Sequence, residues 1–575
     1  MIRDVLARVS VLLIPIMLVG LFGRVLYTPD EPREGSMVVA MAHQADKALP
    51  TLAGEPFAEK PPLLYWMGAA TVTVFGSTPS AMRLPALVYW LGAALAIAVL
   101  VARTSGPQAG FAAGLVAATS LQLYQVGMWL ATDGPLVAGV ALSLLGCFTA
   151  LCAQQRARRQ LGYGLFHVGL AIAFFAKGFA GWMVPGFAYL TVVLWERRFR
   201  ELWSMELWVG ALILMALIGA WVAWVAHGVG GVESLKVMFW YNLVGRAVAV
   251  DAPGALQYAN GHMNSPAKYL LELPVYLLPW TALAVAACRK LPRALQRNDR
   301  EGTAWRLSVG AVLPATLLLS FAATARGVYY GPPALGFAIM IGLYVGSAGA
   351  ALDRWDRWAW RLTGWLIASI AVVLGLLAVL VNFAPVDRSV GSMALGVLAA
   401  VTLIAVVTLS VRTGKITAAC LPTYALAFAL TLTGIAGPVY FKFNQWLSLE
   451  QLAHRIDASR QDQPLQLIDP DETTLAMASL YLPTALADGA RKDAAPWLLW
   501  RVPNRGHWGL SRWLQYMGYR ASPTAVDSEW VSPVAGMRVL CLFERPGGRA
   551  LALLGPVQLP LKNAPRCDGA RLRVD

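Results

Sequence analysis

Charged residues are scarce in this chain. Only 14% of its 575 residues are Asp, Glu, Lys or Arg, whereas 57% are hydrophobic, and the mean hydropathy is +0.56. A soluble globular protein of this length has no need of so many apolar residues, so the composition predicts a polytopic membrane protein. The net charge of +15 does not indicate nucleic-acid binding, because the basic residues fall in short clusters between hydrophobic runs.

Internal repeats, low-complexity runs and a signal-peptide cleavage site are also lacking. The absence of repeated halves weighs modestly against a transporter. No small-residue cleavage site follows the first hydrophobic run, so we expect this run to be a retained span. Cysteine is sparse, and four of the six cysteines lie in or beside hydrophobic runs, where they act as small apolar residues. Cys541 and Cys567 lie in the polar tail and could form a disulfide if the tail is in an oxidising compartment.

About thirteen hydrophobic runs are long enough to cross a membrane, which takes about 20 apolar residues. They are 9–27, 84–102, 108–126, 134–154, 161–176, 179–195, 207–227, 269–288, 305–323, 327–349, 359–381, 392–411 and 417–438. Clusters of Arg and Lys follow only the even-numbered runs; they begin at Arg156, Arg197, Arg289, Arg354 and Arg412. The positive-inside rule therefore predicts a cytoplasmic N-terminus, and an odd number of spans places the C-terminal tail on the exported side.

The predicted fold is mostly α-helical, with a transmembrane domain over 1–438 and a small α/β domain over 439–575. The exported side carries long loops at 28–83 and 228–268. In the first loop, segments 34–44 and 61–76 fit helices that lie in the membrane interface. In the tail, segments 465–469, 496–502 and 537–545 read as strands, and 447–459 reads as an amphipathic helix.

Adjacent carboxylates follow the first span. Asp30 and Glu31 point to different faces of a helix, so one could act on a substrate while its neighbour pairs with Arg33. Pro32 suits a first helical turn, which would present both carboxylates at a helix start. The alternative is a charge cluster that merely ends the span. At the other end of the loop, Glu59 and Lys60 precede a stiff Pro-Pro pair that would direct the lysine back towards the membrane.

Further polar residues lie in other exported turns, and each also has a plain structural interpretation. Asp133 starts the fourth span, where it would also serve as a helix cap. Lys177 lies between the fifth and sixth spans, where an interfacial lysine commonly snorkels. The remaining candidates are Arg246 and His262 in the second long loop, and Arg326, Tyr329 and Tyr330 in the turn before the tenth span. Arg can bind phosphate in a bidentate manner, but aromatic belts supply the same tyrosines without a function.

These candidates converge on one face, from loops that are distant in sequence. A channel or pump would instead need ionisable groups along a route through the bilayer. One-sided convergence therefore favours an enzyme that works at the exported membrane face.

The same residues resemble a known family. The matching segments are DEPR at 30–33, the stretch 50–66, TDGP at 132–135, FFAKG at 174–178, NLVGR at 242–246, HMNSP at 262–266 with LPW at 278–280, and RGVYYGPPAL at 326–335. Together they resemble the GT-C glycosyltransferases that use polyprenyl-phosphate sugars, above all the lipid A aminoarabinose transferases and more distantly the protein O-mannosyltransferases. The resemblance covers residues 9–350. Glu34 departs from it where an aromatic residue is usual, and Phe179 departs where proline is usual.

The resemblance implies inverting sugar transfer at the periplasmic face of a bacterial inner membrane. The donor would be a sugar on undecaprenyl phosphate, such as 4-amino-4-deoxy-L-arabinose, and the acceptor lipid A, another glycan or a protein. Asp30 would be the principal catalytic carboxylate, supported by Asp133 and with Glu31 beside it. The groups around donor phosphate and acceptor would be Arg33, Lys60, Lys177, Arg246, and Tyr329 or Tyr330, with Glu59, His262 and Arg326 close by.

Two questions stay open on sequence alone. Asp30, Glu31, Glu59 and His262 could share a divalent cation, although no ligand spacing demands one. A lipid or sugar flippase and a non-catalytic membrane scaffold are the alternatives to an enzyme.

Overall fold

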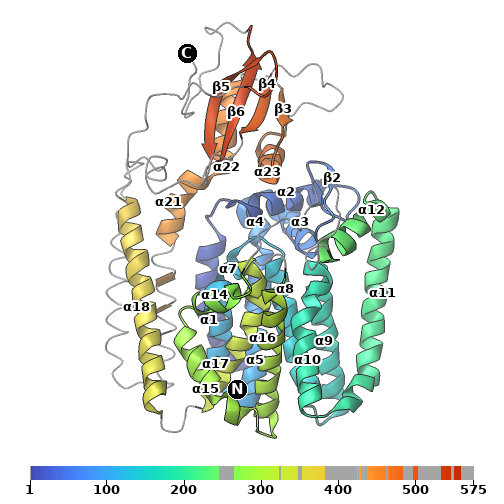
Figure 1. Ribbon diagram of the computed structural model, residues 1–575, viewed down its shortest axis with the longest axis vertical. Helices are drawn as coiled ribbons and strands as arrows, with labels where there is room; N and C mark the ends of the chain where they lie inside the picture. Colours follow the sequence, from blue (N-terminus) through green and yellow to red (C-terminus); the bar gives the residue numbers. More distant parts are fainter. Residues whose placement is uncertain are drawn as a thin grey trace.

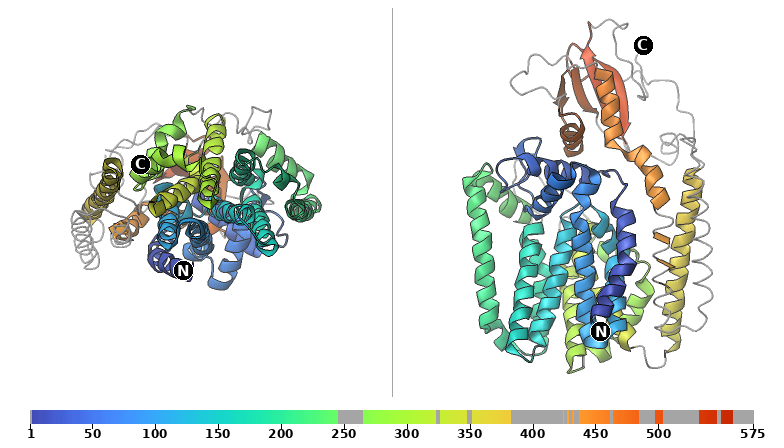
Figure 2. Two further views of the ribbon diagram at one scale, coloured as in Figure 1. Left: turned by 90° about the horizontal axis from the view of Figure 1, so that it is seen from below. Right: turned by 180° about the vertical axis from the view of Figure 1, so that it is seen from behind.

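The computed structural model shows a helical bundle with a small sheet at one end (Figure 1). It describes residues 2–244, 265–322, 326–347, 352–382, 437–460, 464–483, 497–502, 532–545 and 549–558, with isolated positions between 424 and 432. The start of α1 lies at the end of the bundle opposite the sheet (Figure 2). We call the end that bears the sheet the domain end and the opposite end the far end.

Helices make up the bundle. Their bounds are α1 (Ile2–Leu21), α5 (Pro85–Ser105), α6 (Pro107–Thr119), α7 (Leu121–Met128), α8 (Asp133–Leu151), α9 (Arg156–Lys177), α10 (Met183–Trp195), α11 (Met205–His227), α14 (Lys268–Tyr276), α15 (Thr281–Ala294), α16 (Arg300–Ser320), α17 (Gly331–Ser347) and α18 (Arg354–Asn382). Short 3-10 turns occupy Gly178–Trp182, Phe199–Trp203 and Gly327–Tyr330, α12 is Gly231–Lys236, and a π-helical turn follows at Val237–Val244.

Eight helical stretches of the described chain are long and apolar enough to span a membrane, or nine if the bent pair α14–α15 counts as one span. One of the eight, Arg156–Trp195, doubles back on itself, because the Tyr163 hydroxyl lies 3.2 Å from that of Tyr189. It is therefore a pair of antiparallel helices, as the two short runs 161–176 and 179–195 predicted. The runs 392–411 and 417–438 lie almost wholly outside the described residues, so the total of thirteen stays a prediction.

Two expected spans are broken helices instead. The run 108–126 divides into α6 and α7 at Ser120, whose backbone is extended (φ −60°, ψ 135°), and the run 269–288 bends by 116° between α14 and α15. The bend contains Pro279, which cannot donate a helical hydrogen bond. The two breaks satisfy each other: the Leu121 amide donates to the Leu278 carbonyl at 2.8 Å, and the Trp280 indole donates to Thr119 at 3.0 Å. Hydrophobicity counts miss such breaks because the freed backbone groups find partners inside the protein.

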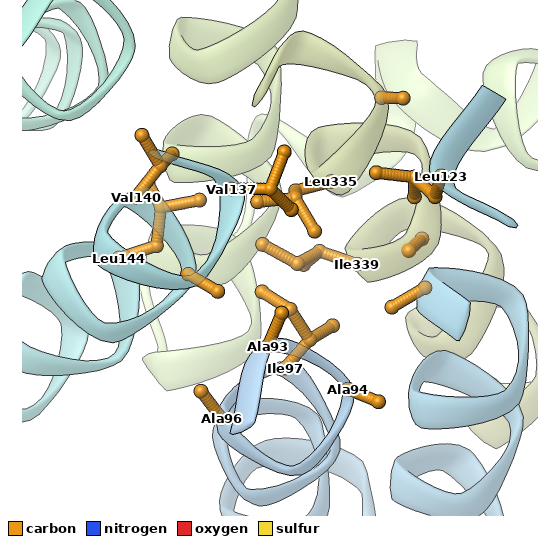
Figure 3. Packing of buried hydrophobic residues seen from close by; sticks show 14 of the residues in the cluster. Ala93, Ala94, Ala96, Ile97, Leu123, Val137, Val140, Leu144, Leu335 and Ile339 are labelled. Atoms are coloured by element: carbon orange, nitrogen blue, oxygen red, sulfur yellow. The ribbon is translucent and has the colours of Figure 1, made fainter. Parts of the chain in front are cut away.

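Small residues let the central helices pack closely. In Figure 3, alanines of α5 and branched side chains of α8 and α17 fill the space between the helices. Between α8 and α9 the backbones themselves touch: a Cβ on Gly146 would lie 2.3 Å from the Phe166 amide nitrogen. Close approach through small residues is the usual source of helix association in membranes.

The first long loop forms a cap across the domain end (Figure 1). It contains α2 (Asp30–His43), a two-residue hairpin of β1 (Thr51–Leu52) and β2 (Glu55–Pro56), α3 (Leu63–Phe75) and α4 (Pro79–Arg83). Helices α2 and α3 therefore occupy the two segments that the sequence predicted as short helices. Their shared core of Met37, Val38, Leu64 and Tyr65 is buried.

The tail carries a four-stranded sheet in the order β3-β4-β6-β5. Its elements are α21 (Gly437–Leu447), α22 (Leu449–Arg460), β3 (Leu465–Ile468), α23 (Glu472–Tyr481), β4 (Trp497–Val502), β5 (Met537–Arg545) and β6 (Arg549–Pro556). β3 pairs with β4 in parallel, with Leu465 opposite Trp497, and the other pairs are antiparallel. The three expected strands and the expected helix are present, whereas β6 was not anticipated. Cys541 of β5 is disulfide-bonded, and Cys567 lies outside the described residues.

The sheet and the bundle are joined through α21 and α23. Asn444 of α21 hydrogen-bonds to the segment after α1, accepting from the Val25 amide at 3.1 Å and donating to the Gly23 carbonyl at 2.6 Å. Helix α23 buries Met477 against the sheet and Ala476 against α2. The tail is therefore packed directly on the helix that begins with Asp30.

Candidate functional site

Helix α2 presents several carboxylates in its first two turns. It begins at Asp30, and Asp30 and Glu31 lie in the first turn, where the positive end of the helix dipole favours acidic side chains. Pro32 fits there because the first-turn amides have no helical partner to lose. The sequence therefore folds locally as expected, but the two adjacent carboxylates face very different surroundings.

Glu31 is enclosed by the protein. Its carboxylate accepts from Arg83 at 2.7 and 2.9 Å, from Arg24 at 3.0 Å and from the backbone amides of Tyr27 and Leu130. Burial alone would raise the pKa of Glu31, but the two arginines outweigh it and hold the pKa below its ordinary value. With no exposed surface, Glu31 cannot reach a substrate. The expectation that it is catalytic is corrected: it fixes the start of α2 against α4 and the segment before α8.

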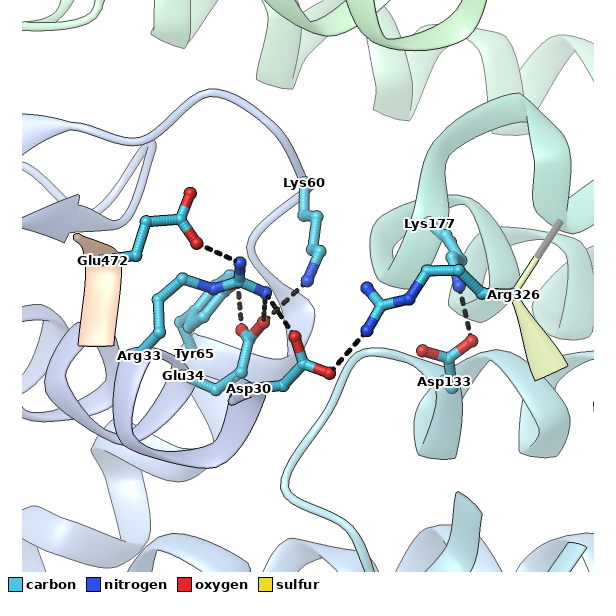
Figure 4. Close-up of polar contacts among 9 residues, drawn as sticks. All are labelled: Asp30, Arg33, Glu34, Lys60, Tyr65, Asp133, Lys177, Arg326 and Glu472. Carbon is cyan, nitrogen blue, oxygen red and sulfur yellow. Dashed lines mark hydrogen bonds and ion pairs between the residues drawn. The ribbon is translucent and has the colours of Figure 1, made fainter. Parts of the chain in front are cut away.

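Asp30 lies between two guanidinium groups. One carboxylate oxygen accepts from Arg33 at 3.3 Å and the other from Arg326 at 2.9 Å (Figure 4). Arg33 comes from the same helix, whereas Arg326 precedes α17, almost three hundred residues later in the chain. The Asp30 side chain keeps 20% of its surface exposed, so it remains open to a bound molecule.

Glu34 joins the side chains of Arg33, Lys60 and Tyr65 in one ionic cluster. In the sequence it stood out only as a departure from the family pattern. Its fully buried carboxylate accepts from Lys60 and Tyr65, both at 2.6 Å, and from Arg33 at 2.9 Å. Burial would raise the pKa of Glu34, yet Lys60 and Arg33 outweigh it and lower the pKa to about 2. An aromatic residue at this position could not hold Lys60 in place, so the departure has a structural reason.

Asp133 and Lys177 form a separate ion pair. The ammonium donates to the carboxylate at 2.5 Å and lies 4.6 Å from the centre of the Tyr329 ring. Asp133 starts α8 and Lys177 ends α9, which pack along their length. The start of α2, the start of α8 and the end of α9 therefore lie close together, as the sequence predicted.

These groups surround a cavity of about 190 Å³, which we call the charged cavity. Its lining carries four acidic and four basic side chains: Asp30, Glu34, Glu59, Asp133, Arg33, Lys60, Lys177 and Arg326. The formal charges of these eight side chains therefore cancel. An entering anion would compete with carboxylates for Lys60, Lys177 and Arg326.

An apolar groove of about 340 Å³ adjoins the charged cavity. The two share Glu59, Lys60, Lys177 and Tyr329 in their linings. Beyond these the groove is lined mainly by apolar side chains of the segment 178–184, by Met238 and Phe239, and by the end of α16 with the two residues after it. The charged cavity and the apolar groove that adjoins it together match a ligand with an ionic head and a hydrocarbon chain.

Three expected site residues lie elsewhere or outside the described chain. Tyr330 is buried, stacks on Tyr269 with ring centres 5.4 Å apart, and its hydroxyl lies 2.9 Å from that of Thr316. The choice between the two tyrosines therefore falls on Tyr329, because residues adjacent on a helical turn face different directions. Arg246 and His262 lie outside the described residues, and so does a cation site that includes His262. Within the described residues, no three potential ligands gather in a way that would hold a metal ion.

The C-terminal tail also contributes to this cluster. Glu472, in the first turn of α23, accepts from Arg33 at 2.5 Å (Figure 4). Asp471, just before it, caps α23 through the Thr474 amide at 2.8 Å and accepts from Arg545 of β5, also at 2.8 Å. Arg33 is thus held by carboxylates from two separate parts of the chain. No feature of the sequence predicted this contact, because nothing in it indicates how the tail docks.

Several known proteins are similar to this chain. The family described as dolichyl-phosphate-mannose-protein mannosyltransferase matches residues 59–224. An undecaprenyl phosphate-α-4-amino-4-deoxy-L-arabinose arabinosyl transferase of Pseudomonas aeruginosa is 29% identical over 331 residues, which cover 56% of each chain. The arabinosyl transferase of the same description from Edwardsiella ictaluri is 28% identical over 393 residues, 65% of each chain.

The fold comparison covers nearly the whole molecule. The crystal structure of ArnT from Cupriavidus metallidurans bound to undecaprenyl phosphate aligns with 96% of this chain and 98% of its own, with a TM-score of 0.68 and 16% identity. This chain is similar in sequence to the aminoarabinose transferases, and it has the fold of the ArnT structure. The chain spans about half the length of the Pseudomonas relative that it matches in sequence. This sequence match is a similarity additional to the shared fold. The mannosyltransferase family match begins at Glu59, so it includes Lys60, Asp133 and Lys177 but not Asp30.

Proposed function

We propose that this protein is an inverting glycosyltransferase that takes a sugar from undecaprenyl phosphate, with 4-amino-4-deoxy-L-arabinose as the sugar and lipid A as the acceptor. The observation that carries the proposal is the junction of the charged cavity with the apolar groove at Lys60, Lys177 and Tyr329. A polyprenyl-phosphate sugar has the same two parts, a charged head and a long hydrocarbon chain. The names of the arabinosyl transferase relatives support the choice of sugar and carrier.

The cations of the charged cavity would hold the donor phosphate. Lys60, Lys177 and Arg326 come from three different elements and each already has a carboxylate partner. As the sugar–phosphate bond breaks, its electron pair moves to the phosphate, and fixed cations stabilise the charge that develops there. The four carboxylates of the same cavity would also provide partners for the ammonium group of an amino sugar.

Asp30 would act on the acceptor side. The acceptor oxygen attacks the anomeric carbon opposite the departing phosphate, which inverts the configuration in a single displacement. When the acceptor is a hydroxyl, Asp30 takes its proton as a general base. When the acceptor is an anionic phosphate of lipid A, Asp30 positions it or stabilises positive charge on the sugar. If the phosphate draws Arg326 away from Asp30, the carboxylate is released at the moment the donor is in place.

The proposal places the charged cavity at the periplasmic face of a bacterial inner membrane, with the N-terminus in the cytoplasm. Basic clusters at the far end and the disulfide at Cys541 support this orientation, since disulfides persist in oxidising compartments.

Transfer between purified components tests the proposal. Protein in detergent is mixed with lipid A and synthetic undecaprenyl-phosphate 4-amino-4-deoxy-L-arabinose, and the lipids are analysed by mass spectrometry. We expect lipid A to gain the mass of the amino sugar, and undecaprenyl-phosphate donors with other sugars to react more slowly. If the protein transfers nothing and instead moves the lipid-linked sugar across vesicles, it is a flippase and the proposal fails.

A further inference from the structure

A second cavity, of about 740 Å³, lies at the far end of the bundle. We call it the remote cavity. It lies where α8 ends, where α10 ends and where the connection 295–300 enters α16. Helix α8 starts at Asp133, in the charged cavity, and its 19 residues span about 28 Å. The two cavities are thus separated by about the thickness of a membrane core, and the proposed transfer reaction makes no use of the remote one.

The remote cavity has an excess of positive charge. Its charged lining residues are four arginines and two acids: Arg197, Arg198, Arg300, Arg306, Glu196 and Asp299. Both acids are already occupied. Glu196 accepts from Arg306 at 2.8 Å and pairs with Arg198 at 3.3 Å, and Asp299 pairs with Arg297 at 2.6 Å while capping α16.

Two of these arginines have no acidic partner within the described residues. The side chains of Arg197 and Arg300 make no ion pair or hydrogen bond within the described part of the chain. Both are exposed at the rim of the cavity. Guanidinium groups without a counter-charge suit phosphate, which they can bind through two parallel hydrogen bonds.

The backbone at Arg197 supports a role for its side chain. Helix α10 ends in a Schellman motif: the Arg198 amide donates to the Val193 carbonyl at 2.8 Å and the Arg197 amide to the Leu194 carbonyl at 3.3 Å. Arg197 occupies the left-handed position of this motif, with φ +54°. Glycine is usual there, because a Cβ atom strains the backbone in that conformation. A cation at this helix end gains from the dipole, but Arg198 already supplies one at an ordinary φ of −89°.

Aromatic side chains mark the depth of the remote cavity. Trp195 is 54% exposed, and Phe199 and Trp203, which follow in the same connection, are 52% and 79% exposed. Exposed aromatic rings of this kind sit at the level of the lipid headgroups. The cavity therefore opens where membrane phosphates lie, and basic pockets between transmembrane helices are known to take such headgroups.

We propose that the remote cavity binds the phosphate of an anionic phospholipid from the adjoining leaflet, through Arg197 and Arg300. The ligand chemistry is a phosphodiester, which lies at the membrane surface in a phospholipid and in solution in a soluble phosphate ester. The depth of the aromatic rings favours the lipid. This proposal is independent of the transfer reaction.

Native mass spectrometry of the delipidated full chain, titrated with phosphatidylglycerol or phosphatidylcholine, tests it. We expect saturable binding of phosphatidylglycerol, at least tenfold weaker in the double variant R197Q/R300Q. The matched control R156Q/R200Q removes two exposed arginines from the same end but outside the cavity lining, and we expect less than a twofold change. The single variant R197G separates binding from folding, because glycine suits φ +54°: it should bind phosphatidylglycerol more weakly while unfolding at the same or a higher temperature.

Three results would overturn the proposal. R197Q/R300Q could bind phosphatidylglycerol as tightly as the wild type, or the control pair could lose as much affinity, in which case only the general positive charge matters. Alternatively, inorganic phosphate or glycerol phosphate could displace the lipid at equal concentration, which would assign the cavity to a soluble phosphate.

Discussion

Replacing Glu34 with Gln removes the buried negative charge that joins Lys60, Arg33 and Tyr65. Burial opposes the charged form of Glu34, but Lys60 and Arg33 outweigh it and lower the pKa from 4.5 to about 2. Since one pKa unit is worth about 1.4 kcal/mol, the carboxylate contributes roughly 3 kcal/mol to folding at neutral pH. Removing one partner of a buried ion pair costs about 3 to 5 kcal/mol. We therefore expect Glu34→Gln to lower the free energy of unfolding by about 3 kcal/mol.

Thermal unfolding in detergent as a function of pH measures this effect. The pKa of Glu34 is depressed in the folded state, so its contribution is complete above the unfolded value of 4.5 and is lost as the pH falls through about 2. The gap in unfolding temperature between wild type and Glu34→Gln should be constant from neutral pH down to about pH 5 and should narrow below it. Glu233→Gln is the matched control, because Glu233 forms an exposed pair with Lys236, and we expect no measurable change. A Glu34→Gln protein as stable as the wild type, or a gap that stays the same at acidic pH, would show that the Glu34 carboxylate does not stabilise the fold through Lys60 and Arg33.

Two further experiments test neighbouring parts of the cluster. Glu31→Gln leaves Arg24 and Arg83 buried without their counter-charge, and we expect it to destabilise the protein by about 3 to 5 kcal/mol in the same unfolding assay; a variant of normal stability that has lost transfer would instead make Glu31 a catalytic group. A double-mutant cycle of Arg33→Gln and Glu472→Gln should give a coupling energy of about 1 kcal/mol, since Glu472 is half exposed. An exposed glutamate of α22, Glu450, serves as the control for that cycle, and a coupling no larger than that of Arg33 with Glu450 would show that α23 does not dock through Glu472.

The sequence located most elements of the charged cavity because charges next to membrane spans are costly and stand out. Asp30, Lys60, Asp133, Lys177 and Arg326 were all expected at one membrane face, and the structure brings them around one cavity. The prediction could not say which carboxylate pairs with which cation, because these contacts join helices far apart in the chain. Glu31 differs from Asp30 because it pairs with Arg83 at the end of α4. Arg83 was not among the predicted site residues, because it is a single arginine at the membrane interface.

Span boundaries were predictable wherever a helix is straight and apolar. The breaks at Ser120 and Pro279 were missed because each is satisfied by the other, and hydropathy does not register a hydrogen bond between two segments. The role of Glu34 was missed for a related reason. A buried carboxylate is not expected from the sequence, because its partners Lys60 and Tyr65 come from a distant part of the loop.

We propose that the Asp30 carboxylate acts on the acceptor in sugar transfer. Asp30→Asn keeps the size of the side chain and one oxygen that can accept from Arg33 or Arg326, but it removes the charge and the second acceptor oxygen. Its matched control is Asp299→Asn, the same change at the far end of the bundle, where Asp299 is exposed beside Arg297.

The deciding measurement is the rate of transfer from undecaprenyl-phosphate 4-amino-4-deoxy-L-arabinose to lipid A by these two variants and the wild type. We expect Asp30→Asn to be slower by at least about a hundredfold, the usual contribution of a general base, while its unfolding temperature stays close to that of the wild type and Asp299→Asn keeps full activity. A folded Asp30→Asn protein that transfers the sugar at the wild-type rate would show that the Asp30 carboxylate does not act on the acceptor.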